Sequence, residues 1–311
     1  MGQHGLAVWL GFTGIVVVLL VLDLGVLNRR SHVLSVKEAM SWSFGLIAFA
    51  LVFGLFLWWR EGSQHALEYY TGYLIELSLS VDNLFVFILI FNYFGVPSEA
   101  QPKVLKWGIL GAIVMRFIMI AVGALLLQRF EWIIYVFGGI LILTGLRMLL
   151  QKDERIEPEK NPIVRLARRL LPFSDSYDGA HFTSRTGTGR VLATPLVLVL
   201  LVVEWSDLVF AIDSIPAIFA ITRDPFLVYS SNVFAILGLR ALFFVLAGML
   251  DRFVYLKPGV ALILVFVGGK MAVSAWLHVP TLASLAVVVV MLGGAVGLSL
   301  WRSGQEARQA A

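Results

Sequence analysis

Long apolar stretches dominate this chain and restrict its fold more than any other feature. Nine of them reach about 20 residues, the length of helix that crosses the hydrocarbon core of a bilayer. They cover roughly residues 6–27, 40–59, 68–94, 104–127, 131–150, 191–221, 230–250, 256–277 and 280–301. A strand barrel fits poorly, because its strands alternate apolar and polar residues whereas these runs are continuous. The sequence therefore predicts an all-α polytopic membrane protein, with residues 1–311 forming one transmembrane domain.

Composition excludes the main alternatives to a membrane protein. The chain is 59% hydrophobic and 14% charged, whereas soluble domains carry about 25% charged residues. It contains no cysteine, so neither a disulfide framework nor thiol chemistry is available to it. The net charge of +4 is no sign of a nucleic-acid partner, because its meaning depends on where the basic residues lie.

The basic residues are distributed unevenly between the two sides of the predicted membrane. Connections on the N-terminal side hold three Lys and Arg, whereas those on the other side hold 17. Positive charge accumulates on the cytoplasmic side of membrane proteins. We therefore expect a protein of the cell membrane with its N-terminus outside and its C-terminus in the cytoplasm.

The longest connection, residues 151–190, is expected to be cytoplasmic. Its segment RLARRLLPF places Arg165, Arg168 and Arg169 on one helical face and Leu166 and Leu170 opposite. Such a helix could lie on the anionic inner leaflet. Ordinary positive-inside charge is the favoured explanation of the same residues, and the role of this loop stays open.

The chain contains an internal repeat. The segment ELSLSVDNLFVF (76–87) aligns with DLVFAIDSIPAI (207–218), and WGILGAIVMR (107–116) aligns with SNVFAILGLR (231–240). The matched polar pairs are Glu76 with Asp207, Asp82 with Asp213, Asn83 with Ser214, Arg116 with Arg240, and Arg147 with Lys270. Residues 68–150 and 191–277 are thus two copies of three spans each. Three spans is an odd number, so the copies must be inverted, as in many transporters.

Charged residues inside the predicted spans point to function. A charge at the bilayer centre costs about 2.5–3.5 kcal/mol on insertion scales, so each must pair, protonate or bind a cation. The acids inside or at the edge of the spans are Asp23, Glu76, Asp82, Glu204, Asp207 and Asp213. We expect Asp82 and Asp213 to form the centre of a cation site where the repeats meet, with Glu76, Asp207 and Glu204 as additional ligands or access-path acids. Further polar residues and charge partners are Asn83, Ser214, Asn232, Arg116 and Arg240.

Helix geometry and ligand type refine this site. Glu76 and Ser80 share a helix face, whereas Pro216 removes the N–H that would bond the carbonyl of Ile212 and tends to break the helix. All five histidines lie in loops or at span ends, which leaves oxygen ligands alone. Oxygen suits Mg²⁺, Ca²⁺ and Mn²⁺, whereas Zn²⁺ favours nitrogen or sulfur. No prosthetic group is expected, and the cation is the cargo.

The motifs ELSLSVDNLFVF, EWSDLVFAIDSIPAIFAIT and SSNVFAILGLRALFF resemble the signature segments of the TerC family of integral membrane proteins, including its Alx-type members. The resemblance covers roughly residues 6–301 and groups the chain with LysE-type exporters. It implies manganese homeostasis, chiefly Mn²⁺ export across the cytoplasmic membrane. The family's acids carry over onto Glu76, Asp82, Glu204, Asp207 and Asp213. The family is named for tellurium resistance. Direct transport of the tellurite anion, however, fits an acidic centre poorly.

We therefore expect an exporter that exchanges a divalent cation for protons. Other functions are alternatives to it. Ca²⁺ is an alternative cargo. Two intramembrane aspartates are also typical of aspartyl proteases, but their GxGD signature is absent, because Asp213 follows Phe-Ala-Ile and Asp82 follows Leu-Ser-Val. We therefore expect no enzyme. A membrane scaffold that supports metallation or assembly of secreted proteins is a further alternative. A partner membrane protein or a homo-oligomer is compatible with all of these readings.

Overall fold

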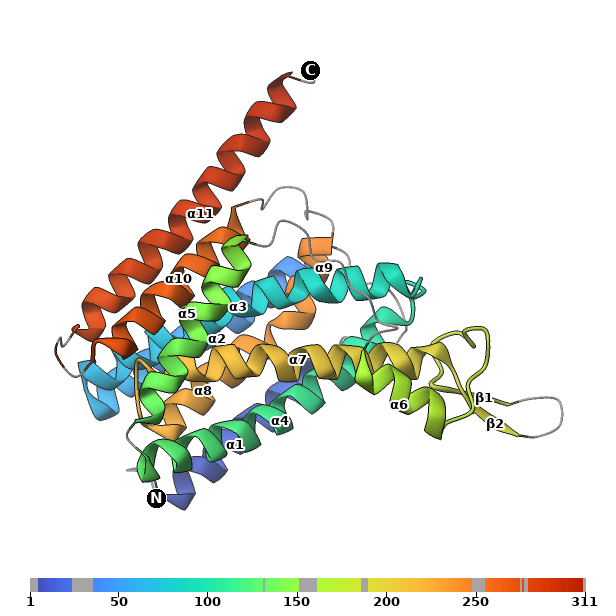
Figure 1. The fold of residues 1–311 in the computed structure, drawn as a ribbon, viewed down its shortest axis with the longest axis horizontal. Coiled ribbons are helices and arrows are strands. Elements are labelled where there is room, and N and C mark those ends of the chain that lie inside the picture. Colours follow the sequence, from blue (N-terminus) through green and yellow to red (C-terminus); the bar gives the residue numbers. More distant parts are fainter. Residues whose placement is uncertain are drawn as a thin grey trace.

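The computed structural model describes residues 5–23, 36–130, 132–150, 161–185, 190–247, 255–274, 276 and 279–309; within them, the side chains of Asp82 and Arg240 and of 36, 85, 304 and 306–309 lie outside the description. The described part is almost entirely helical (Figure 1). Its helices are α1 (Leu6–Val21), α2 (Val36–Glu61), α3 (Ser63–Tyr93), α4 (Gln101–Arg129), α5 (Ile133–Leu150), α6 (Pro162–Leu170), α7 (Pro195–Phe219), α8 (Pro225–Leu237), α9 (Leu239–Ala247), α10 (Leu256–Ala272) and α11 (Thr281–Gln309). Two short strands, β1 (Thr183–Arg185) and β2 (Val191–Ala193), form an antiparallel pair.

Six helices of the described part are long and apolar enough to cross a membrane, and they are α2, α3, α4, α5, α7 and α11. A seventh span results if α8 and α9 are counted together, although they are bent by 49°. The two remaining predicted spans, 6–27 and 256–277, coincide with α1 and α10, which have only 16 and 17 residues. An all-α polytopic membrane protein is therefore confirmed, whereas the count of nine spans stays a prediction.

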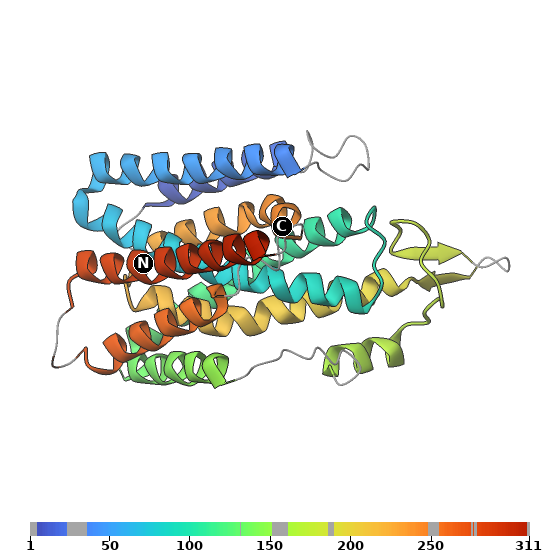
Figure 2. The ribbon, with the colours of Figure 1, turned by 90° about the horizontal axis from the view of Figure 1, so that it is seen from above.

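The centre of the bundle is formed by helices from both predicted repeats. α3 packs against α7 and α8, and α4 packs against the same two helices. α1 and α2 cover α8 from one side, and Figure 2 shows them together along one edge of the bundle. Residues that lie far apart in the sequence are thus brought to one interface between α3, α4, α7 and α8.

α5 and α10 cross each other through glycines. A Cβ added to Gly138 would lie 2.9 Å from the carbonyl oxygen of Gly268, and one added to Gly145 would lie 2.7 Å from that of Ala261. Because 138 pairs with 268 and 145 with 261, the two helices run antiparallel. Small residues let helix backbones approach closely in membranes. α10 also packs against α11, so α5, α10 and α11 lie side by side in both views.

Residues 161–185 and 190–194 form a folded unit at one end of the bundle. α6 packs against α7, and strand β1 pairs Thr183 with Ala193 of β2. The hydroxyl of Tyr177 donates to the carbonyl of Phe94 at 2.8 Å, which ties this unit to the end of α3. The predicted start of the sixth span at 191 is wrong, because residues 191–193 pair with β1 and α7 begins only at Pro195.

α7 continues through Pro216 rather than ending there. The helix ends at Phe219, three residues beyond the proline. A proline costs its helix one hydrogen bond, but this loss falls in the last turn of α7. The predicted break at Pro216 is therefore wrong, and α7 presents its polar residues from one continuous helix.

Candidate cation site

A buried ion pair links the first two helices of the site. Arg116 of α4 donates through Nη1 to Oε1 of Glu76 of α3, and both side chains are 0% exposed. Ser80, one turn along α3, donates to the same Oε1 at 3.3 Å. The same Nη1 lies 3.2 Å from Oγ of Ser214 on α7. Arg116 thus connects an acid of its own repeat with a hydroxyl of the other repeat.

Asp207 and Glu204 extend this acidic centre along α7. Asp207 is only 2% exposed, and it lies within electrostatic range of both Arg116 and Glu76. Glu204 is half-buried and is one turn away from Asp207 on the same helix. Its carboxylate lies directly against Gly111 of α4, where any Cβ would overlap it. The glycine therefore makes room for this carboxylate between α4 and α7.

Some carboxylate oxygens in this centre can still accept a hydrogen bond or bind a cation. Within the described part of the chain, Oε2 of Glu76 and Oδ1 of Asp207 are buried without a hydrogen-bond partner. Buried polar atoms in native proteins nearly always have one. Two carboxylate oxygens left in this state, on neighbouring helices and near one guanidinium, are what a cation or its hydrating water would satisfy.

Asp213 belongs to a second polar layer of the site. It lies six residues beyond Asp207, about 9 Å along the helix axis. Its Oδ1 accepts a hydrogen bond from Oγ1 of Thr144 on α5 at 2.8 Å, and Arg147 of α5 interacts with it electrostatically. As with Arg116 and Ser214, this contact joins residues of the two predicted repeats.

The remaining predicted site residues are distributed over α3, α8 and α9. Asn83 of α3 is buried, and Asn232 of α8 is fully buried. Nδ2 of Asn83 and both amide atoms of Asn232 have no hydrogen-bond partner among the described residues. Asp82 lies on α3 and Arg240 on α9, but both side chains fall outside the described part. How Asp82 is oriented toward Asp213 therefore stays a prediction.

A polar cavity opens at the end of the bundle where α7 ends. It has a volume of about 290 Å³, and its charged lining residues are Glu68, Arg223 and Lys270. Nζ of Lys270 donates to Oγ of Ser284 on α11 at 3.0 Å, while Nε2 of Gln64 donates to Oε1 of Glu68 at 2.8 Å. This end of the molecule therefore offers a polar, charged surface beside the last turn of α7.

The predicted acids do not form a closed metal cage here. Among the side chains that the structure describes, no group of three or more His, Cys, Asp or Glu residues is close enough to hold a metal ion together. Glu76 and Asp207 instead lie near Arg116, Glu204 interacts with Asp207, and Asp213 stands apart with Thr144. Any ion bound in this geometry would need water or hydroxyl oxygens to complete its coordination.

Two site residues escaped prediction from sequence. Thr144 was one hydroxyl within an apolar span, and Gly111 was one glycine among 28. Thr144 lies one turn before Arg147. Its position next to an intramembrane charge could have indicated that it belongs to the site. Gly111 carried none, because its role depends on a carboxylate from a distant helix.

Comparison with known proteins gives a consistent result. The profile of the integral membrane protein TerC family matches residues 61–307. An uncharacterized membrane protein of Myxococcus xanthus is 50% identical over 303 residues, 97% of this chain and 94% of the relative. The "Putative membrane-bound redox modulator Alx" of Salmonella typhi is 46% identical over 306 residues, 96% of this chain and 95% of the relative. Its Escherichia coli K12 namesake is 47% identical over 289 residues, 90% of each chain. No solved structure matches the chain.

Proposed function

Because the chain belongs to the TerC family of integral membrane proteins, we propose that it is a secondary transporter that exports a divalent cation, Mn²⁺ before Ca²⁺, in exchange for protons. One observation carries this proposal. Glu76 and Asp207 lie buried in the bundle with carboxylate oxygens that lack a hydrogen-bond partner in the described part of the chain. Buried acids in membrane spans typically mark ion pathways and proton relays.

Ligand chemistry selects the class of cargo. Apart from the guanidinium groups of Arg116 and Arg147, the polar groups around the site are carboxylates, hydroxyls and amides, and the chain has no cysteine. Hard divalent cations prefer such oxygen ligands. An oxyanion would meet like charge at Glu76, Asp207 and Glu204. The site therefore suits Mn²⁺ or Ca²⁺ rather than tellurite or Zn²⁺.

The packing of α5 on α10 supports an inverted repeat. In the alignment that matches Arg147 with Lys270, Gly138 corresponds to Ala261 and Gly145 corresponds to Gly268. The contact between Gly138 and Gly268 therefore has the contact between Ala261 and Gly145 as its symmetry mate. The central helices follow the same rule, since α3 packs on α8 as α4 packs on α7. Such pseudo-twofold packing suits alternating access.

In the proposed cycle, the cytoplasm-open state binds the cation through deprotonated carboxylates centred on Asp82 and Asp213. Glu76, Asp207 and Glu204 supply further oxygens or line the access path, and the acids converge as the cation loses water. Rocking of one repeat against the other then changes contacts such as Thr144 with Asp213 and Arg116 with Ser214. Protons entering from outside compete for the same oxygens and release the cation.

The names of the Alx relatives suggest a role in redox modulation. The sequence restricts the chemistry by which this chain could have such a role. A chain without cysteine cannot carry out thiol–disulfide exchange by itself. Control of the concentration of a redox-active cation such as Mn²⁺ would influence the redox state of the cell without thiol–disulfide exchange by this chain. A scaffold for metallation of secreted proteins remains the second candidate, and it predicts that function survives neutralising the acids but not removing residues 151–190.

The proposed setting is the cytoplasmic membrane. Nine spans, with the N-terminus outside and the C-terminus in the cytoplasm, follow from the three-to-17 distribution of basic residues. This orientation places the unit formed by α6, β1 and β2 on the cytoplasmic side. The cation would then leave toward the face on which α7 ends.

The test is cation flux through the purified protein. Proteoliposomes are loaded with radiolabelled Mn²⁺, and flux is measured under an imposed pH gradient with Ca²⁺ and Mg²⁺ as competitors. We expect Asp82→Asn and Asp213→Asn to abolish flux while the protein is inserted at normal abundance. The matched control is Asp175→Asn, in the exposed segment before β1. If either site variant transports at the unmodified rate, the site assignment is wrong. If the unmodified protein moves no divalent cation, the transporter proposal falls.

A further inference from the structure

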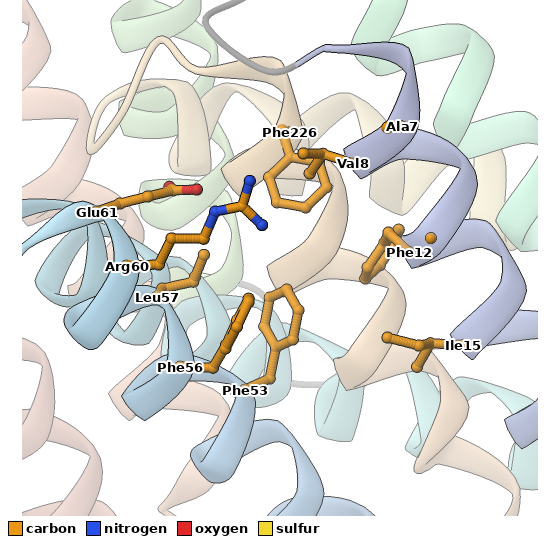
Figure 3. A pocket seen from close by; sticks show the side chains of 11 residues that line it. Ala7, Val8, Phe12, Ile15, Phe53, Phe56, Leu57, Arg60, Glu61 and Phe226 are labelled. Atoms are coloured by element: carbon orange, nitrogen blue, oxygen red, sulfur yellow. The ribbon is translucent and has the colours of Figure 1, made fainter.

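A second cavity lies apart from the acidic centre, between α1 and α2. It has a volume of about 250 Å³. One wall comes from α1 and includes Val8 and Ile15, and the other comes from the last turns of α2. Figure 3 shows Phe53 and Phe226 on one side of the cavity and Phe12 facing them from α1. These three rings are buried and in mutual contact, with Phe12 and Phe226 edge to face at 5.5 Å.

The cavity is wide where α1 faces it. Gly11 lines the cavity, and a Cβ added there would find no atom within 4 Å. An apolar space of this size inside a bilayer is unfavourable if empty, because its lining side chains lose their dispersion contacts. Water gains little in it, because few polar partners line the walls. An apolar chain is the occupant that such walls favour.

Charge is confined to one end of the cavity. Arg60, near the end of α2, extends its guanidinium toward Phe226 across the opening, as Figure 3 shows. The two preceding residues, Trp58 and Trp59, are 57% and 83% exposed. Tryptophan concentrates at the headgroup level of membranes, so Arg60 lies at the depth of lipid phosphates. From Phe53 to Arg60 the helix rises about 10 Å, which places the apolar part of the cavity among the acyl chains.

We propose that this cavity is a phospholipid-binding site, with an acyl chain between α1 and α2 and the headgroup phosphate bound by Arg60. Arginine binds phosphate through two parallel hydrogen bonds, which gives the site a preference for a phosphodiester over a neutral lipid. Glu61 lines the same opening, so a headgroup that combines phosphate with an ammonium group, as in phosphatidylethanolamine, matches both charges. This proposal depends only on the chain spanning a bilayer and is independent of the cation cargo.

The test is native mass spectrometry of the full-length protein released from nanodiscs of equal parts phosphatidylethanolamine and phosphatidylglycerol. We expect one phosphatidylethanolamine to stay bound after the surrounding lipid has been removed. Arg60→Gln should reduce its retention about tenfold, as expected from loss of a charge-assisted pair. Gly11→Phe, which fills the cavity, should abolish retention.

Two controls separate binding from general damage. Gly14→Phe alters the same helix at a position that does not line the cavity and is equally open. Arg129→Gln removes an exposed arginine from the end of α4. Both should retain the lipid. The proposal is overturned if no lipid stays bound, if a second protein copy is retained in its place, or if Arg60→Gln and Gly11→Phe bind as well as their controls. Should Gly11→Phe fail to fold, Arg60→Gln alone decides.

Discussion

Gly138 of α5 and Gly268 of α10 are in backbone contact, since a Cβ on Gly268 would lie 2.7 Å from the carbonyl oxygen of Gly138. Replacing either glycine should therefore push the two helices apart. We expect Gly138→Ala and Gly268→Ala each to destabilise the protein by about 1–3 kcal/mol, the usual cost of overpacking. Thermal unfolding in detergent measures this. Gly139→Ala and Gly269→Ala are matched controls, because a Cβ there would meet no atom within 4 Å. Equal melting temperatures for all four variants would contradict the crossing.

The buried pair of Arg116 and Glu76 gives a second prediction. Arg116→Met leaves the carboxylate of Glu76 buried without its cation, and breaking such pairs costs about 3–5 kcal/mol. We expect low yield and early unfolding. The double variant Glu76→Gln with Arg116→Met removes both charges and should recover most of the stability, but not cation flux. A single variant that is as stable as the parent would argue against the pair.

Thr144 should influence affinity more than folding. Thr144→Val keeps the shape of the side chain but removes the donor to Asp213, and hydrogen bonds to charged groups contribute about 1.5–3 kcal/mol. We expect the KM for Mn²⁺ to change by about tenfold or more at unchanged protein abundance. Thr144→Ser retains the hydroxyl and serves as the control. If the KM of the valine variant equals that of the serine variant, Thr144 has no role at Asp213.

Gly111 provides a way to move one acid without replacing it. In Gly111→Ala the new methyl group overlaps the carboxylate of Glu204, which must swing away because it is the flexible end of its side chain. We expect a several-fold loss of flux with little loss of stability. Gly108→Ala, one turn earlier on α4, only approaches Val203 at 3.2 Å and should retain flux. Equal flux in both variants would remove Glu204 from the cation path.

Topology can be tested at the chain ends. A phosphatase that is active only outside the cytoplasm, fused ahead of Met1, should be active. A fluorescent protein that matures only in the cytoplasm, fused after Ala311, should fluoresce. Both expectations follow from the distribution of basic residues. Ends located on the same side would require an even number of spans and exclude the predicted nine.

Sequence reasoning located the helices well because bilayer thickness sets their length. Among the described residues, each predicted span overlaps a helix or a bent helix pair. Local residue preferences predicted secondary structure less well where tertiary contacts or the position within a helix override them. Val191 begins a strand because Arg185 is its pairing partner, and Pro216 stays helical because only the last turn of α7 lies beyond it.

The site was predictable in its charges and less so in its contacts. The cost of intramembrane charge singled out Glu76, Asp207 and Arg116 from their positions alone. That Arg116 would also reach Ser214 could not be derived, because helix periodicity does not give the rotation of α4 relative to α7. The hydroxyl of Thr144 was overlooked because a threonine costs little in an apolar span, so that only its position one turn before Arg147 distinguished it.

The contact between Thr144 and Asp213 also means that the two predicted repeats are not interchangeable. The alignment that matches Arg147 with Lys270 matches Thr144 with Val267, a residue that cannot donate a hydrogen bond. If the chain transports a cation as proposed, an ion that approaches from one face of the membrane would therefore meet different chemistry from an ion that approaches from the other. In the proposed transporter, unequal affinities on the two sides would make movement of the cation faster in one direction than in the other under gradients of equal size.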